Sequence, residues 1–309
     1  MSKLKEILDR IPVISWLVAV SSRARLPGFE GMTAYDLWET YSVGIVQGAF
    51  TLRASAISYS FFMAIFPFII FILNLIPFVP IDDFQIEFLS FVNDLLPAQA
   101  AGSFDNIFRE IALQENTGLL TISFVTSLFF MSNGINAVFD GFERSYHSSF
   151  NRNMIRQYII SVGVSLLLSL FLLVMVIITG TFEFWINDLR AQDFMTQSST
   201  EIWLIIIRIS TAILLLYLFV ATLYYTGTKE GRDTHFFSIG SVMTTVLIII
   251  ISYLYGIYLD NFASYNEIYG SIGALIILMI YIWLNANLLL LGYELNASIR
   301  SLKARNLKV

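Results

Sequence analysis

Residues 270–296 read GSIGALIILMIYIWLNANLLLLGYELN, and no charged residue occurs in this stretch before Glu294. At the α-helical rise of roughly 1.5 Å per residue the stretch extends about 40 Å, which is enough to cross a lipid bilayer. The bilayer core offers the backbone no water, so the stretch must be helical and its polar side chains must face protein or a wet cavity. Asn285 and Asn287 also lie in its second half, so the pattern predicts a helix with one polar and one apolar end.

The composition of the whole chain indicates the same environment. Of its 309 residues, 57% are hydrophobic and 13% are charged, and the mean hydropathy is +0.72. Soluble domains carry roughly 25% charged residues, so we predict a membrane protein with several spans. The chain has no cysteine, which excludes disulfides, thiol nucleophiles and thiolate metal sites.

Six stretches are long and apolar enough to span a bilayer, and they predict an all-α polytopic membrane protein. We divide the chain into a cytoplasmic amino-terminal segment at 1–53, a six-helix transmembrane domain at 54–296 and a basic cytoplasmic tail at 297–309. Pro67 lies in the middle of the first span, where it predicts a kink that is either static or a moving hinge. The predicted spans are 54–77, 118–139, 157–181, 202–226, 236–259 and 270–296.

Amphipathic helices are expected at the membrane surface. Residues 11–20 are apolar but too short to span, and we favour an interfacial helix over a signal peptide there. Residues 33–52 begin with a capping box and continue with apolar residues at helical spacing. The acidic loop at 78–117 has room for two short helices, near 83–96 and 103–115.

Basic residues are distributed unevenly between the two sides of the predicted membrane. Fifteen Lys and Arg residues fall on the side of both termini, whereas the loops on the other side hold two, Arg109 and Arg190. Those same loops contain thirteen acidic residues. The positive-inside bias therefore predicts that both termini are cytoplasmic.

Polar side chains gather at the predicted cytoplasmic ends of the spans, while the outer halves are mainly Leu, Ile, Val and Phe. Unpaired amides and carboxylates are costly in hydrocarbon, so we expect these groups to meet around a cavity open to the cytoplasm or the inner leaflet. The alternatives are interhelical hydrogen bonds for the asparagines and headgroup contact for the acids. The residues expected to line the cavity or bind substrate are Arg53, Ser55, Ser58, Tyr59, Asn133, Asn136, Asp140, Asn285, Asn287 and Glu294.

Arg53 is the residue expected to bind an anion, because its forked donors suit phosphate or carboxylate. The alternative is that Arg53 pairs with Asp140 or Glu294, or reaches lipid phosphate. Arg208, near the outer end of the fourth span, is expected to extend to the outer interface or to form an outer gate or ion pair.

Gly270 and Gly273 open the last span, and together with Pro67 they are expected to permit helix movement or close packing. The sequence gives little support for an enzyme. The two histidines, His147 and His235, lie in predicted cytoplasmic loops with no partner at metal-ligand spacing. No Walker loop, nucleophile elbow or HExxH motif occurs, so we expect no catalytic residue, metal, cofactor or nucleic-acid partner.

Three motifs resemble the YihY/BrkB family of membrane proteins, once described as ribonuclease BN. They are RASAISY at 53–59, YGSIGA at 269–274 and LGYELNA at 291–297, and the likeness covers roughly residues 35–300. Tyr293 departs from the pattern, because a small residue is expected at its position. The resemblance implies a bacterial inner-membrane protein with envelope or serum-resistance phenotypes that is proposed to transport lipids or other amphiphiles, and whose nuclease label is regarded as mistaken.

These expectations combine into a transporter or flippase for an anionic or amphipathic, lipid-like substrate that enters from the cytoplasm or the inner leaflet. Because the sequence contains no ATP-binding motif, the energy is expected from an ion gradient, the membrane potential or the gradient of the substrate. Membrane lipids are expected partners, and a homo-oligomer is one option for the assembly. The alternatives are a non-transporting envelope scaffold and an ion-coupled exchanger or channel.

Overall fold

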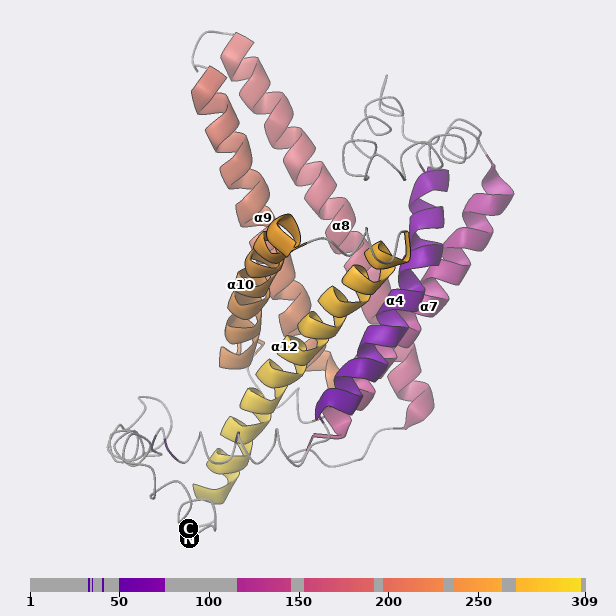
Figure 1. The fold of residues 1–309 in the computed structure, drawn as a ribbon, viewed down its shortest axis with the longest axis vertical. Coiled ribbons are helices and arrows are strands. Elements are labelled where there is room, and N and C mark those ends of the chain that lie inside the picture. Colours follow the sequence, from indigo (N-terminus) through magenta and orange to yellow (C-terminus); the bar gives the residue numbers. More distant parts are fainter. Residues whose placement is uncertain are drawn as a thin grey trace.

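The predicted six-span, all-α architecture is confirmed by the structure, a computed structural model (Figure 1). Six helices are long and apolar enough to cross a membrane, and no β-strand occurs among the described residues. The helices are α4 (Phe50–Leu75), α7 (Thr117–Glu143), α8 (Met154–Ala191), α9 (Gln197–Gly227), α10 (Ile239–Phe262) and α12 (Ser271–Asn306). The structure describes residues 33, 35, 41, 50–75, 116–145, 153–191, 197–229, 236–262 and 271–306.

Several predicted features lie outside these residues. They are the interfacial helices at 11–20 and 33–52, apart from Thr33, Tyr35, Tyr41 and the start of α4, the loop helices at 83–96 and 103–115, His147, His235, Gly270 and the last residues of the basic tail.

Two helices run ten residues beyond the ends predicted for them. α8 ends at Ala191 rather than at residue 181, and α12 ends at Asn306 rather than at residue 296. Neither extension contains glycine or proline, the residues that most strongly end a helix. Hydropathy marks where a chain leaves hydrocarbon, and a helix can continue past that point, so the two boundaries differ.

The beginning of α4 and the end of α12 lie at the same end of the bundle, the lower end in Figure 1. We call this end the base; the end of α7, the beginning of α8, the end of α9 and the beginning of α10 are also there. α7 packs along both α4 and α8, α9 packs along α8 and α10, and α12 packs against both α10 and α4. Away from the base, the α4–α7 pair and the α8–α9 pair diverge (Figure 1).

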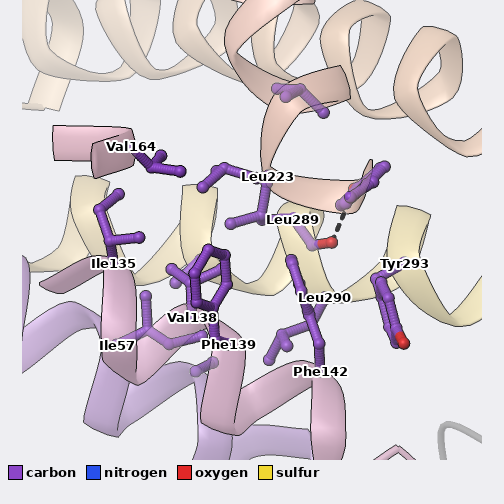
Figure 2. Close-up of a cluster of buried hydrophobic side chains, with 14 of the residues drawn as sticks. Ile57, Ile135, Val138, Phe139, Phe142, Val164, Leu223, Leu289, Leu290 and Tyr293 are labelled. Atoms are coloured by element: carbon purple, nitrogen blue, oxygen red, sulfur yellow. Dashed lines mark hydrogen bonds between the residues drawn. The ribbon is translucent and has the colours of Figure 1, made fainter. Parts of the chain in front are cut away.

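The best-buried side chains lie toward the base, on one face of each helix. On α12, Ala286, Leu289, Leu290 and Tyr293 recur at the helical spacing i, i+3, i+4 and i+7 and are all buried. Figure 2 shows these side chains meeting those of α4, α7, α8 and α9. This core cluster consists of Ala54, Ile57, Ile135, Val138, Phe139, Phe142, Val164, Val220, Leu223, Tyr224, Ala286, Leu289, Leu290, Tyr293 and Ala297.

The backbones of α10 and α12 meet at Gly240 and Gly292. A Cβ atom added to Gly240 would collide with the Gly292 carbonyl, and one added to Gly292 would collide with the Thr244 hydroxyl. The Asn296 amide oxygen accepts a hydrogen bond from the Gly240 N–H at 2.9 Å, and its nitrogen donates to the Ser238 hydroxyl at 2.8 Å. Small residues permit this close approach, and Asn296 satisfies a backbone donor in the first turn of α10.

Gly292→Ala is expected to lower the unfolding temperature of the protein in detergent, because the new methyl group has no space between α10 and α12. Overpacking of a well-packed contact costs about 1–3 kcal/mol. Gly163→Ala on α8 is the matched control, since nothing lies within 4 Å of a Cβ atom there. Equal unfolding temperatures for the two variants would contradict the close crossing.

Candidate functional site

A buried ion pair joins α4 to α12 near the base. Arg53, in the first turn of α4, is 5% exposed, and Glu294 on α12 is fully buried. The Arg53 Nη2 and Glu294 Oε2 atoms are 3.8 Å apart, so the groups attract each other without forming a close hydrogen bond. Arg53 also donates from Nη1 to the Gly141 carbonyl on α7 at 2.8 Å. The guanidinium group therefore connects three helices.

Much of the hydrogen-bonding capacity of this pair is unused. Apart from this ion pair, no hydrogen-bond partner within the described part of the chain reaches Nε or Nη2 of Arg53, or either carboxylate oxygen of Glu294. The Ser298 hydroxyl, one turn farther along α12, is also buried without a hydrogen-bond partner among these residues. Buried charges are normally hydrogen-bonded, because removing an ion from water costs several kcal/mol. The pair is thus an under-bonded polar site inside an apolar bundle.

The segment before α4 is influenced by the same carboxylate. Burial raises the pKa of the Tyr41 phenol to about 12, and the negative charge of Glu294 adds to the rise. Tyr41 therefore keeps its proton at neutral pH. The Arg53 guanidinium carbon also lies 5.5 Å from the centre of the Phe50 ring, which is a cation–π distance.

Aromatic side chains fill the base beside the ion pair. The rings of Phe142 and Tyr293 are stacked, with centres 4.2 Å apart and planes 8° from parallel, and Tyr224 packs edge-on against both. The Tyr293 hydroxyl donates to Thr228 at 3.0 Å, and the Tyr224 hydroxyl donates to the Leu289 carbonyl at 2.7 Å. Tyr293 thus stands where a small residue was expected because its ring supplies the centre of this packing.

A second cluster of polar side chains lies between α7 and α8. The Gln157 side-chain nitrogen is 2.6 Å from Asp140 Oδ1 and 3.1 Å from Asn136 Oδ1. Together with Met154 and Tyr158, these side chains line a pocket of about 430 Å³. The carboxylate and amides suit a cationic or hydrogen-bonding ligand. Among the described residues, no group of three or more His, Cys, Asp and Glu side chains is placed to hold a metal ion.

An apolar cavity of about 270 Å³ lies between α4, α9, α10 and α12. Its polar side chains are Asn285 and Tyr281. The Asn285 nitrogen donates to the Tyr281 carbonyl at 2.8 Å, while its side-chain oxygen is buried with no hydrogen-bond partner among the described residues. The cavity therefore combines hydrocarbon walls with one unused acceptor. Its lining consists of Ile57, Phe61, Leu216, Phe219, Val220, Ile248, Tyr281, Ile282, Asn285, Ala286 and Leu289.

The other residues predicted for the site, or for gating and packing, lie outside the ion pair, the polar pocket between α7 and α8, and the apolar cavity. Ser58 is buried and donates to the Met279 carbonyl on α12 at 3.3 Å, whereas Asn287 donates to the Trp283 carbonyl of its own helix at 2.7 Å. Ser55, Tyr59 and Arg208 are exposed, Asn133 and Pro67 are half-buried, and Gly273 is buried.

The structure therefore distributes the predicted residues over separate places rather than around one chamber. Residues at one depth share a level of the bundle, but helical register decides the direction of each side chain. Asn285 and Glu294 illustrate this, because nine residues are two and a half helical turns and place them on opposite sides of α12. Glu294 approaches Arg53, and Asn285 faces the apolar cavity.

Two residues that line these pockets, Gln157 and Tyr281, were not among the predicted site residues. Gln157 precedes Ser161 and Ser165 at i, i+4 and i+8 spacing, and this stripe of buried polar residues marks one face of α8. Tyr281 lies one turn before Asn285 and lines both the apolar cavity and another cavity of about 350 Å³ between α10 and α12. A search for polar residues at helical spacing from the predicted ones would have found both.

Comparison with known proteins places most of the chain in a family and gives a relative that matches most of its length. The sequence profile of the family described as virulence factor BrkB matches residues 44–308, which include all six helices. The chain is also 29% identical over 253 residues to YfkH of Bacillus subtilis (strain 168), a protein named as ribonuclease-like. That match covers 81% of this chain and 90% of YfkH. No solved structure shows a significant match.

Shorter matches connect the chain to proteins named UPF0761 membrane proteins. The protein from Psychrobacter sp. (strain PRwf-1) is 41% identical over 59 residues, which are 19% of this chain and 11% of that protein. The protein from Xanthomonas oryzae pv. oryzae (strain PXO99A) is 36% identical over 64 residues, which are 21% of this chain and 15% of that protein.

Arg53→Met is expected to destabilise the protein, because Glu294 loses its buried counter-charge. Removal of one partner from a buried pair costs roughly 3–5 kcal/mol. The double variant Arg53→Met/Glu294→Gln is expected to unfold at a higher temperature than Arg53→Met, since it leaves no charge alone. Thermal unfolding in detergent measures the stability of Arg53→Met, of Glu294→Gln and of the double variant. If the stability lost by the double variant equals the sum of the losses of the two single variants, the two side chains are not coupled.

Proposed function

Because the chain belongs to the virulence factor BrkB family of membrane proteins, we propose that it transports an amphipathic, lipid-like substrate across the bacterial inner membrane. The observation that carries this proposal is the apolar cavity of about 270 Å³ between α4, α9, α10 and α12. Small-ligand sites occupy roughly 300–1,000 Å³, so the cavity suits one hydrocarbon chain or a compact apolar group rather than a whole lipid.

The polar groups near this cavity favour an amphipathic substrate over a purely apolar one. The unused Asn285 oxygen can accept a hydrogen bond from a hydroxyl or amide of a molecule in the cavity. Farther toward the base, Arg53 carries donors that the described residues leave free, and these suit an anionic headgroup. The hydrocarbon part and the headgroup of one substrate would therefore use different parts of the bundle.

The proposed orientation places the base at the cytoplasm. The positive-inside bias supports it, because the base carries both ends of the six-helix bundle and the connections rich in Lys and Arg. Transport involves no bond cleavage. A ribonuclease assay of the purified protein tests whether this chain has the activity that the name of the B. subtilis relative suggests.

Single cysteines test the orientation directly, since the chain has no cysteine of its own. Lys229→Cys, at the base, is expected to react only with reagents that reach the cytoplasm. Thr117→Cys, at the opposite end of the bundle, is expected to react with an impermeant maleimide applied to intact cells. Both side chains are exposed, so reaction of Lys229→Cys from outside and protection of Thr117→Cys would reverse the proposed topology.

Reconstituted vesicles test the transport proposal. Wild-type protein is expected to move a fluorescent phospholipid between leaflets, measured by quenching with a reductant that cannot cross the membrane. Ala286→Phe is expected to abolish this movement, because the ring fills the cavity that Ala286 lines. Ala56→Phe, on the exposed side of α4, is the matched control and is expected to keep it.

The unfolding temperature of each variant separates loss of transport from loss of fold. Asn285→Leu serves as a second variant, since it keeps the approximate volume and removes the polar acceptor. Unchanged lipid movement in a folded Ala286→Phe protein would refute the assignment of transport to this cavity. Absence of lipid movement in the wild type would instead favour the scaffold hypothesis.

A further inference from the structure

Glu294 is a carboxylic side chain in apolar surroundings. It is fully buried, and its neighbours on α12, Tyr293 and Ala297, belong to the core cluster. Neither of its oxygens has a hydrogen-bond partner among the described residues, and the nearest charge is the Arg53 guanidinium at 3.8 Å. An ionised carboxylate depends on that counter-charge, whereas a protonated carboxyl group does not.

The balance between these states depends on few groups. The Arg53 charge acts on Glu294 from α4, and Tyr41 responds to the Glu294 charge from the segment before α4. α7 presents the uncharged Gly141 carbonyl, which holds Arg53. The titratable and charged groups on the described parts of the surrounding helices include Arg53 of α4, Asp140 and Glu143 of α7, Tyr224 of α9, and Tyr293 and Arg300 of α12 itself. Arg53 forms the ion pair with Glu294, whereas Asp140 accepts a hydrogen bond from Gln157 and Tyr224 donates one to Leu289.

Protonation of Glu294 would change what Arg53 can bind. Without the carboxylate charge, Arg53 would keep its hydrogen bond to Gly141 and would have Nε and Nη2 available for another anion. Phosphate and carboxylate fit these forked donors. Proton binding at Glu294 and anion binding at Arg53 would therefore favour each other, and thermodynamic linkage makes that coupling reciprocal.

We propose that Glu294 binds the proton that drives transport, and that its protonation admits an anionic headgroup to Arg53. The inference rests on the proposed transport function. The carboxylate takes a proton from water on one side of the membrane and becomes a neutral acid; it returns the proton to water on the other side when the substrate leaves. Only an O–H bond forms and breaks. The buried Ser298 hydroxyl, which also has no hydrogen-bond partner among the described residues, lies one turn farther toward the end of α12.

Infrared difference spectroscopy tests the proton site without any transport. The full-length protein in lipid is recorded over a series of pH values, and the carboxylic C=O band is compared between wild type and Glu294→Gln. A pH-dependent band that is lost in Glu294→Gln and kept in Asp140→Asn is expected. If the wild type and Glu294→Gln show the same pH-dependent carboxylic bands, the inference is overturned.

Transport measurements separate failure of this inference from failure of the proposed function. Vesicles of phosphatidylethanolamine and phosphatidylglycerol carry fluorescent phosphatidylglycerol as the anionic probe. An imposed pH gradient is expected to accelerate its movement by the wild type and to have no effect in Glu294→Gln. Wild-type movement that ignores the gradient would overturn proton coupling and leave transport standing. No wild-type movement at all would refute both transport and its coupling, while the infrared result would still decide whether Glu294 is the proton-binding group.

Discussion

Helices surrounded by lipid gain little free energy by hiding apolar side chains from it, because the acyl chains are equally apolar. Their association depends instead on close packing and on polar contacts that lipid cannot supply. In this protein both are concentrated at the base. The glycine contact between α10 and α12, the Asn296 bonds to α10 and the Arg53 bond to α7 all lie there. Elsewhere, side chains such as Ile205 and Leu254 are exposed and suit contact with lipid.

This constraint explains the motif LGYELNA at 291–297 residue by residue. Gly292 permits the helix crossing, Tyr293 stacks on Phe142, and Asn296 bonds to the start of α10. Ala297 is fully buried in the core cluster, and Glu294 is the partner of Arg53. Only one side of the motif RASAISY at 53–59 packs against other helices. Arg53, Ala54, Ile57 and Ser58 are buried, while Ser55 and Tyr59 are exposed.

The number and approximate position of the spans could be predicted because a bilayer sets a minimum length of apolar helix. The ends of α8 and α12 could not, since hydropathy does not mark where a helix ends outside the hydrocarbon. For the site, sequence reasoning predicted the depth of each polar residue and included the Arg53–Glu294 pairing as an alternative. It could not predict direction: Asn285 and Asn287 are only two residues apart, yet the Asn285 oxygen faces the cavity and Asn287 bonds within α12. Register relative to a neighbouring helix is a property of packing, which hydropathy does not record.

The crossing of α10 and α12 has a mechanical consequence. Gly240 lies at the second residue of α10, and α10 is bonded to α12 again farther along the helix. The Ser252 and Tyr281 hydroxyls are 2.7 Å apart, and the Tyr255 hydroxyl donates to the Ile277 carbonyl at 2.7 Å. These two levels are separated by roughly 20 Å of α10. A swing of α10 about the glycines would break both of the farther bonds, so α10 and α12 form a pair that is braced near each end.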